Sequence, residues 1–128
     1  MVYLGTPADD FLNAYAAVLE ANQRAMALVR PGLPAGEVDR AARSVLEAAG
    51  CGPFFIHRTG HGLGLEGHEP PWIMDGEATI LREGMVFSIE PGVYLVGQFG
   101  IRIEDIVVVT DSGVRNLTKF DHALVIKD

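Results

Sequence analysis

The sequence predicts an α+β fold in which two helices precede an antiparallel sheet. Up to about residue 50, apolar side chains recur at helical spacing. From Cys51 onward, glycine and proline become frequent, and short β-rich runs replace that spacing. The 128 residues contain no repeat, linker or low-complexity tract, so we expect one domain, 1–128, around one core.

The first helix is expected soon after the opening segment MVYLGTP, whose alternating apolar residues and final turn are typical of the end of a strand. Thr6 followed by Pro7 indicates a helix start, because the hydroxyl can accept from free backbone amides. The run stops at Pro31 and Gly32, which predicts a long amphipathic helix. Its apolar face comprises Phe11, Tyr15, Val18, Ala25, Met26 and Val29.

The second helix is predicted from about Ala35 to Ala49, and Gly50 can take the left-handed cap. Its apolar side comprises Val38, Ala42, Val45 and Ala49. Short apolar and β-branched runs then predict a sheet made of several strands. The predicted strands are Phe54 to His57, Met85 to Glu90, Val93 to Leu95, Ile101 to Val109 and Leu124 to Ile126.

Composition excludes several classes of function. Ten basic and seventeen acidic side chains give a net charge of −7 without a basic run, so we expect no nucleic-acid partner. No apolar run approaches the roughly 18 residues of a membrane span, and no signal segment opens the chain, so we expect no membrane partner. The single Cys51 has no intrachain partner, which favours a reducing compartment and therefore the cytoplasm.

A histidine cluster is the densest polar feature of the chain. The segment HRTGHGLGLEGHE contains His57, His61 and His68, which are three of the four histidines. Glycines on both sides of His61 allow tight backbone geometry and leave room for another group to approach the imidazole. One such histidine alone is typical of a surface or a hydrogen-bonded core, whereas three together favour a functional site.

Two glutamates occur in strands with apolar neighbours, Glu90 in VFSIEPG and Glu104 in IRIEDIVVV. A buried carboxylate needs a cation, a metal or a proton, so we expect a partner for each. Arg102 and Glu104 share one strand face, and a simple pair of the two on a solvated face is the alternative. An imidazole with two carboxylates suits manganese or a similar divalent ion, although the spacing alone does not establish a metal site.

Three segments in order, HRTGHGLGLEGHE, SIEPGVYL and RIEDIVVVT, resemble the M24-type metallopeptidase family of prolidase (Xaa-Pro dipeptidase) and Xaa-Pro aminopeptidase. The resemblance covers essentially the whole chain, because VYLGTP, RPGLPAGEVD and NLTKFDHALVI also resemble segments that the family carries in that order. It implies part of a pita-bread fold, with two N-terminal helices followed by a curved antiparallel sheet.

The resemblance also implies roles for individual residues. His61, Glu90 and Glu104 match metal ligands of the family, and Glu104 matches the ligand that bridges two ions. His57 and His68 match histidines that line the substrate site and stabilise the developing oxyanion. Arg102 and Tyr94 match positions that orient the metal-binding carboxylates.

The implied chemistry is hydrolysis of the bond between any residue and a following proline. Two divalent ions, manganese first and cobalt or zinc as alternatives, would activate a shared water in the parent enzyme. Glu90 would accept the proton of that water, while His57 and His68 would donate hydrogen bonds that strengthen as the oxyanion forms. The partner is therefore a proline-containing peptide.

Two further metal ligands of the family, both aspartates ahead of the segment resembling MVYLGTP, have no counterpart here. The aspartates are at positions 9, 10, 39, 75, 105, 111 and 121, and the first two fit a helix start instead. We therefore expect the C-terminal portion of a catalytic domain without its upstream portion, inactive alone and binding one metal ion weakly or none. Open sheet edges favour pairing with the missing portion or with another copy.

Two alternatives stay open at this point. Methionine aminopeptidases and creatinase-like enzymes share the fold, although EPGVY together with GLEGHE is more similar to the proline-specific branch. The alternative from another functional class is a noncatalytic binding module. The absence of the two aspartates is what we would expect of a module that has lost its metal ions. The sequence does not separate a dipeptidase from an aminopeptidase.

Overall fold

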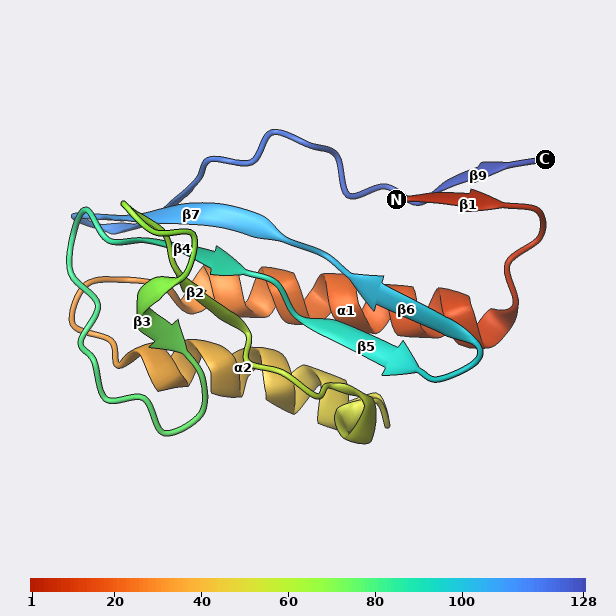
Figure 1. Ribbon diagram of the computed structural model, residues 1–128, viewed down its shortest axis with the longest axis horizontal. Helices are drawn as coiled ribbons and strands as arrows, with labels where there is room; N and C mark the ends of the chain where they lie inside the picture. Colours follow the sequence, from red (N-terminus) through yellow and green to blue (C-terminus); the bar gives the residue numbers. More distant parts are fainter.

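Two antiparallel helices form one layer of the molecule. The computed structural model describes all 128 residues, with α1 at Asp9–Leu28 and α2 at Ala35–Ala48. Figure 1 shows the two helices side by side and running in opposite directions. Helix α1 packs against β4, β5, β6 and β8 (Val86–Ile89, Gly92–Leu95, Phe99–Arg102 and Gly113–Asn116), and α2 packs against β3 (Glu69–Ile73).

The main sheet has five strands in the order β3-β2-β4-β7-β8, in which β2 is Gly60–Gly62 and β7 is Asp105–Thr110. All its pairings are antiparallel. The expectation of an α+β fold with two helices before an antiparallel sheet is confirmed. Because β2 lies between β3 and β4, His61 is inside the sheet, with His57 before β2 and His68 in the connection from β2 to β3.

Two smaller pairs of strands complete the fold. Strands β5 and β6 form an antiparallel hairpin, and β1 (Val2–Leu4) pairs in parallel with β9 (Val125–Lys127). Figure 1 shows the two ends of the chain lying side by side through this pairing. Strand β1 at the start of the chain was expected, and β9 corresponds to the prediction of a strand near 124–126.

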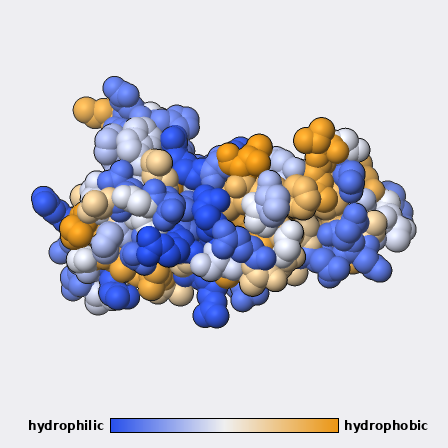
Figure 2. Space-filling model, turned by 90° about the horizontal axis from the view of Figure 1, so that it is seen from below, coloured by the Kyte–Doolittle hydropathy of each residue, from blue (hydrophilic) through white to orange (hydrophobic).

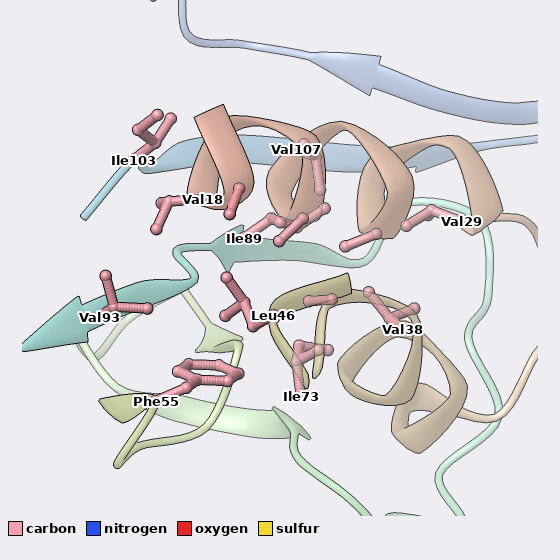
Figure 3. Packing of buried hydrophobic residues seen from close by; sticks show 14 of the residues in the cluster. Val18, Val29, Val38, Leu46, Phe55, Ile73, Ile89, Val93, Ile103 and Val107 are labelled. Atoms are coloured by element: carbon pink, nitrogen blue, oxygen red, sulfur yellow. The ribbon is translucent and has the colours of Figure 1, made fainter. Parts of the chain in front are cut away.

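The core lies between the helices and the strands and contains 23 buried hydrophobic residues. Figure 3 shows side chains from both layers directed into it, including Val18 of α1, Leu46 of α2, Ile89 of β4 and Val107 of β7. All four side chains are fully buried. Burial of this apolar surface is the main stabilising contribution, at roughly 25 cal/mol per Å² removed from water.

Several strand predictions were wrong in their bounds. The chain forms a short 3-10 helix, η1, at Gly52–Phe54, and the predicted strand from Phe54 to His57 is absent. The run from Ile101 to Val109 is divided between β6 and β7, because the chain changes from the hairpin to the main sheet between them. Strands β2 and β3 were not predicted, since β2 is rich in glycine and β3 in proline, and both residue types are depleted in most strands.

The helix starts and faces also differ in detail. The N-cap of α1 is Ala8 without a side-chain hydrogen bond, so the cap predicted at Thr6 is wrong. In α2 the buried face contains Leu46 rather than the exposed Ala49. The left-handed conformation predicted for Gly50 is confirmed by its φ of 74°.

The segment between β8 and β9 is fastened to the core through Tyr15 and His122. The Tyr15 hydroxyl donates to the His122 backbone carbonyl. The His122 Nε2 lies 2.9 Å from the buried Asp105 carboxylate, which also accepts from Asn116 at 2.8 Å. Burial, and secondarily the charge of Asp121, raises the pKa of Tyr15.

Replacing Tyr15 with phenylalanine is expected to change the alkaline dependence of stability. An unfolded tyrosine ionises near pH 10, whereas folded Tyr15 keeps its proton to higher pH, so the free energy of unfolding falls as the pH rises above about 10. Urea unfolding on both sides of pH 10 should show this fall in the wild type and a smaller one in Tyr15→Phe. Equal falls in both proteins would contradict the assignment.

Hydrophobic residues on the face shown in Figure 2 lie in several separate groups, and hydrophilic residues cover much of the middle. Large exposed hydrophobic side chains include Leu65, Val96 and Phe120, which belong to three different connecting segments. Neither helix combines the length and apolar composition that crossing a membrane requires.

Candidate functional site

One cavity of about 520 Å³ collects most of the predicted site residues. It is bounded by β2, the end of β4, the end of β6 and the segments that flank β2 and β3. Only one of its lining residues is hydrophobic. The lining residues are His57, Arg58, His61, His68, Met74, Glu90 and Arg102.

His61 and Glu90 form the centre of this cavity. The His61 Nε2 lies 3.1 Å from the Glu90 Oε1, and the two side chains are only 10% and 12% exposed. The pairing of β2 with β4 brings them together, and the Glu90 amide donates to the Thr59 carbonyl at 2.7 Å. Ser88, two residues before Glu90 on β4, donates to the same Oε1 at 2.9 Å.

The hydrogen bonds of His61 leave Nε2 suited to a cation. The His61 Nδ1 lies 3.0 Å from the Gly62 carbonyl, which can only accept, so Nδ1 carries a proton. In the neutral ring, Nε2 therefore presents a lone pair toward the Glu90 carboxylate. A lone pair and a carboxylate oxygen at this separation need a proton or a metal ion between them, and imidazole with carboxylate is a usual donor set for divalent metals.

Glu104 does not join this pair. It lies in the connection between β6 and β7 and is exposed, so the prediction of a buried Glu104 was wrong, and Arg102 pairs with Glu90 rather than with Glu104. It borders a neighbouring cavity of about 300 Å³, which shares Arg102 with the first. No group of three or more histidine, cysteine, aspartate or glutamate side chains is arranged to hold a metal ion.

Arg102 and Tyr94 lie beside the site but contact different groups. The Arg102 Nη1 is 3.6 Å from the Glu90 Oε2, a weak ion pair because half of the arginine side chain is exposed. The Tyr94 hydroxyl is 2.9 Å from the His57 Nε2. Arg102 therefore contacts a carboxylate of the predicted site, and Tyr94 contacts a histidine instead.

The other two histidines differ in their surroundings. His57 is half-buried, and its Nδ1 is 2.7 Å from the Arg58 carbonyl, so both ring nitrogens are already hydrogen-bonded. His68 is exposed, and its ring centroid lies 4.0 Å from that of His61. His68 has no hydrogen bond at either ring nitrogen, whereas the His57 ring in its neutral form donates from Nδ1 to the Arg58 carbonyl and accepts at Nε2 from the Tyr94 hydroxyl.

The glycines beside His61 are needed for close approach of the neighbouring strands. A Cβ atom on Gly60 would lie 1.8 Å from the Ser88 carbonyl oxygen, and one on Gly62 would lie 2.4 Å from the Pro70 carbonyl oxygen. The group that approaches this segment is therefore the backbone of β4 and β3. This close packing fixes the backbone that carries His61.

A buried ion pair behind the site was not predicted. The Asp39 carboxylate is fully buried and accepts from Arg43 Nε at 3.0 Å and from the Thr59 amide at 2.9 Å. Arg43 also donates to the carbonyls of Phe55 and His57, at 3.3 and 3.1 Å. These two side chains of α2 therefore hold the segment that carries His57. Their spacing of four residues is visible in the sequence but is equally typical of an exposed helix pair.

Known proteins match this chain over almost its whole length. The family model described as metallopeptidase family M24 matches residues 1–111. The chain is 44% identical to the Xaa-Pro dipeptidase of Pyrococcus furiosus over 124 residues, which are 97% of this chain and 36% of that protein. The chain spans about a third of the length of the curated relatives that it matches.

Solved structures give the same result. The crystal structure of dipeptidase PepE from Mycobacterium ulcerans matches with a TM-score of 0.95 and 47% identity, covering 98% of this chain and 34% of that one. A prolidase from Thermococcus sibiricus matches with a TM-score of 0.95 and 46% identity, covering 98% and 34%. The expected likeness to the pita-bread fold of prolidases is therefore confirmed over almost the whole chain.

Proposed function

We propose, from the premise that this chain belongs to metallopeptidase family M24, that its cavity is part of a metal-dependent site that hydrolyses the bond before a proline. The family implies a divalent metal ion. We propose manganese as the metal, with cobalt or zinc as alternatives. The complete site would bind two ions and cleave peptides that have proline after the scissile bond.

One observation carries the proposal, namely the 3.1 Å separation of the His61 Nε2 and the Glu90 Oε1. Gly62 fixes the proton of His61 on Nδ1, and Ser88 orients the Glu90 carboxylate from the other side. Two metal-binding atoms oriented in this way, one by a backbone carbonyl and one by a hydroxyl, favour a metal site, because such supporting contacts orient ligands before a metal binds.

The surrounding residues suit the chemistry of peptide hydrolysis. A divalent ion bound here would supply a water of lowered pKa and polarise a carbonyl. Glu90 would accept a proton at its carboxylate. His68, which has no hydrogen bond in the protein, would donate to the carbonyl oxygen of the substrate, and His57 would do so from Nε2 after this nitrogen gains a proton and releases Tyr94. Arg102 would hold the second oxygen of Glu90.

Two converging donors are too few for a closed metal site, which usually needs three or four protein ligands. We therefore propose that the remaining ligands come from residues outside this chain, with Glu104 as a further ligand of the complete site. The isolated chain should then bind one ion weakly and be inactive. The open edges of the main sheet at β3 and β8 would favour pairing with another chain.

Paramagnetic NMR tests the metal site without requiring activity. Substoichiometric Mn²⁺ added to the isolated chain should broaden the ring signals of His61 and His68 before those of His122, which lies near Asp105 instead. Glu90→Gln should abolish this selective broadening, because it removes the anionic donor while keeping the shape.

Glu83→Gln is the matched control, since Glu83 is exposed and lies outside the cavity. Broadening that is absent, unselective or unchanged in Glu90→Gln would contradict the metal site. Such a result would favour the noncatalytic binding module, the alternative that the lack of a third donor supports.

Hydrolysis of Ala-Pro tests the expected inactivity. The isolated chain loaded with manganese should release proline no faster than the same mixture with Glu90→Gln. Cleavage at a rate near that of full-length prolidases would show that this chain holds a complete site.

A further inference from the structure

Arg58 is the one cation of the cavity without a carboxylate partner. Its side chain is half-buried and makes no ion pair or hydrogen bond with the protein. Its guanidinium lies over the ring of Trp72, 4.5 Å from the centroid. Trp72 pairs directly with His61 across β2 and β3, so the register of the sheet places this stack beside the His61–Glu90 pair.

The charge of the cavity contrasts with that of the chain. The chain carries a net charge of −7, yet the cavity has two arginines and one carboxylate among its lining residues. Glu90 lies 3.6 Å from Arg102, which leaves Arg58 free to attract an anion. A guanidinium without a carboxylate partner in a cavity is well suited to a planar anion, because its N–H groups match the two oxygens of a carboxylate.

Trp72 prepares Arg58 for this role. A guanidinium over an indole is attracted by the negative face of the ring, and this contact limits the rotamers of a long side chain. An arginine ordered before binding loses less conformational entropy when it binds an anion. The stack therefore holds the guanidinium in the cavity wall rather than in solvent.

We propose that Arg58, held by Trp72, binds the free carboxylate of a short peptide and so gives the site a preference for dipeptides. This inference rests on the proposed function. In a dipeptide the carboxylate is one residue, about 3.5 Å of extended chain, beyond the bond that is cleaved. A longer peptide has an uncharged amide at that place and leaves the arginine without its anion.

The single tryptophan of the chain allows a direct binding test. Titration of the isolated chain with Ala-Pro, followed by Trp72 fluorescence, should give a dissociation constant about tenfold or more below that for Ala-prolinamide. Arg58→Gln should remove the difference between the two peptides. Arg58→Lys, which keeps the charge but not the planar fork, should keep only part of it.

Arg30→Gln is the control, because Arg30 is exposed, makes no side-chain contact and lies outside the cavity. It should keep the full preference for Ala-Pro. Equal affinity for the two peptides in the wild type, or an unchanged preference in a folded Arg58→Gln chain, would overturn the inference. The test needs neither metal nor hydrolysis, so its outcome is separate from that of the proposed function.

Discussion

Replacing Gly60 with alanine is expected to destabilise the chain by about 3 kcal/mol or more. The added Cβ atom would lie 1.8 Å from the Ser88 carbonyl oxygen, which belongs to the backbone of β4 and cannot move aside without disturbing the sheet. The strands would have to separate where His61 faces Glu90. Urea unfolding followed by circular dichroism measures the loss.

Gly67→Ala is the matched control, because a Cβ atom at that position meets no atom within 4 Å and the residue has no positive φ. Its stability should stay within about 0.5 kcal/mol of the wild type. If Gly60→Ala were as stable as this control, the close approach of β2 and β4 would be wrong. The arrangement of His61 and Glu90 would then have to be reconsidered as well.

Replacing Asp39 with alanine is expected to cost about 3 kcal/mol, since it leaves Arg43 without its charge partner in a largely buried position. The Thr59 amide would also lose its acceptor. Because Arg43 binds the carbonyls of Phe55 and His57, the loss should loosen the segment that carries His57. Urea unfolding gives the stability, and hydrogen exchange of the Thr59 amide reports the local opening.

The same helix offers a control in the exposed pair of Glu37 and Arg40, whose charged atoms are 2.9 Å apart. Glu37→Ala should cost less than about 1 kcal/mol, because solvent screens an exposed pair. Arg43→Lys should lose less stability than Asp39→Ala, since lysine keeps the charge. It should still lose some, because lysine cannot bind two carbonyls and a carboxylate together. Similar losses in Asp39→Ala and Glu37→Ala would mean that the buried pair does not fasten the His57 segment.

The sequence allowed both helices and several residues that line one cavity to be singled out, because these features depend on local patterns. Helical spacing of apolar residues identified α1 and α2. His57, His61 and His68 lie within twelve positions, so they were expected to be close in any fold. Glu90 was singled out because a carboxylate inside an apolar strand needs a partner, and it lies beside His61.

Sequence patterns gave wrong predictions for two strands and for the burial of one glutamate. Strand β2 carries glycines and β3 carries prolines, which normally interrupt sheets, and β2 needs its glycines because β4 and β3 approach it too closely for a Cβ atom. Glu104 has apolar neighbours like those of Glu90, yet it lies in a turn and is exposed. Local sequence cannot separate these two cases, because burial depends on what packs against the strand.

The sequence by itself therefore determined the α+β class, the family and the segments that line the cavity, since each follows from residues near one another in the chain. Only the tertiary structure decided which side chains meet. It buried Asp39 with Arg43 behind His57, and it placed Arg58 on Trp72 inside the cavity. These contacts join α2 to the site and link neighbouring strands, and such pairings depend on the packing and register of the whole fold rather than on local spacing.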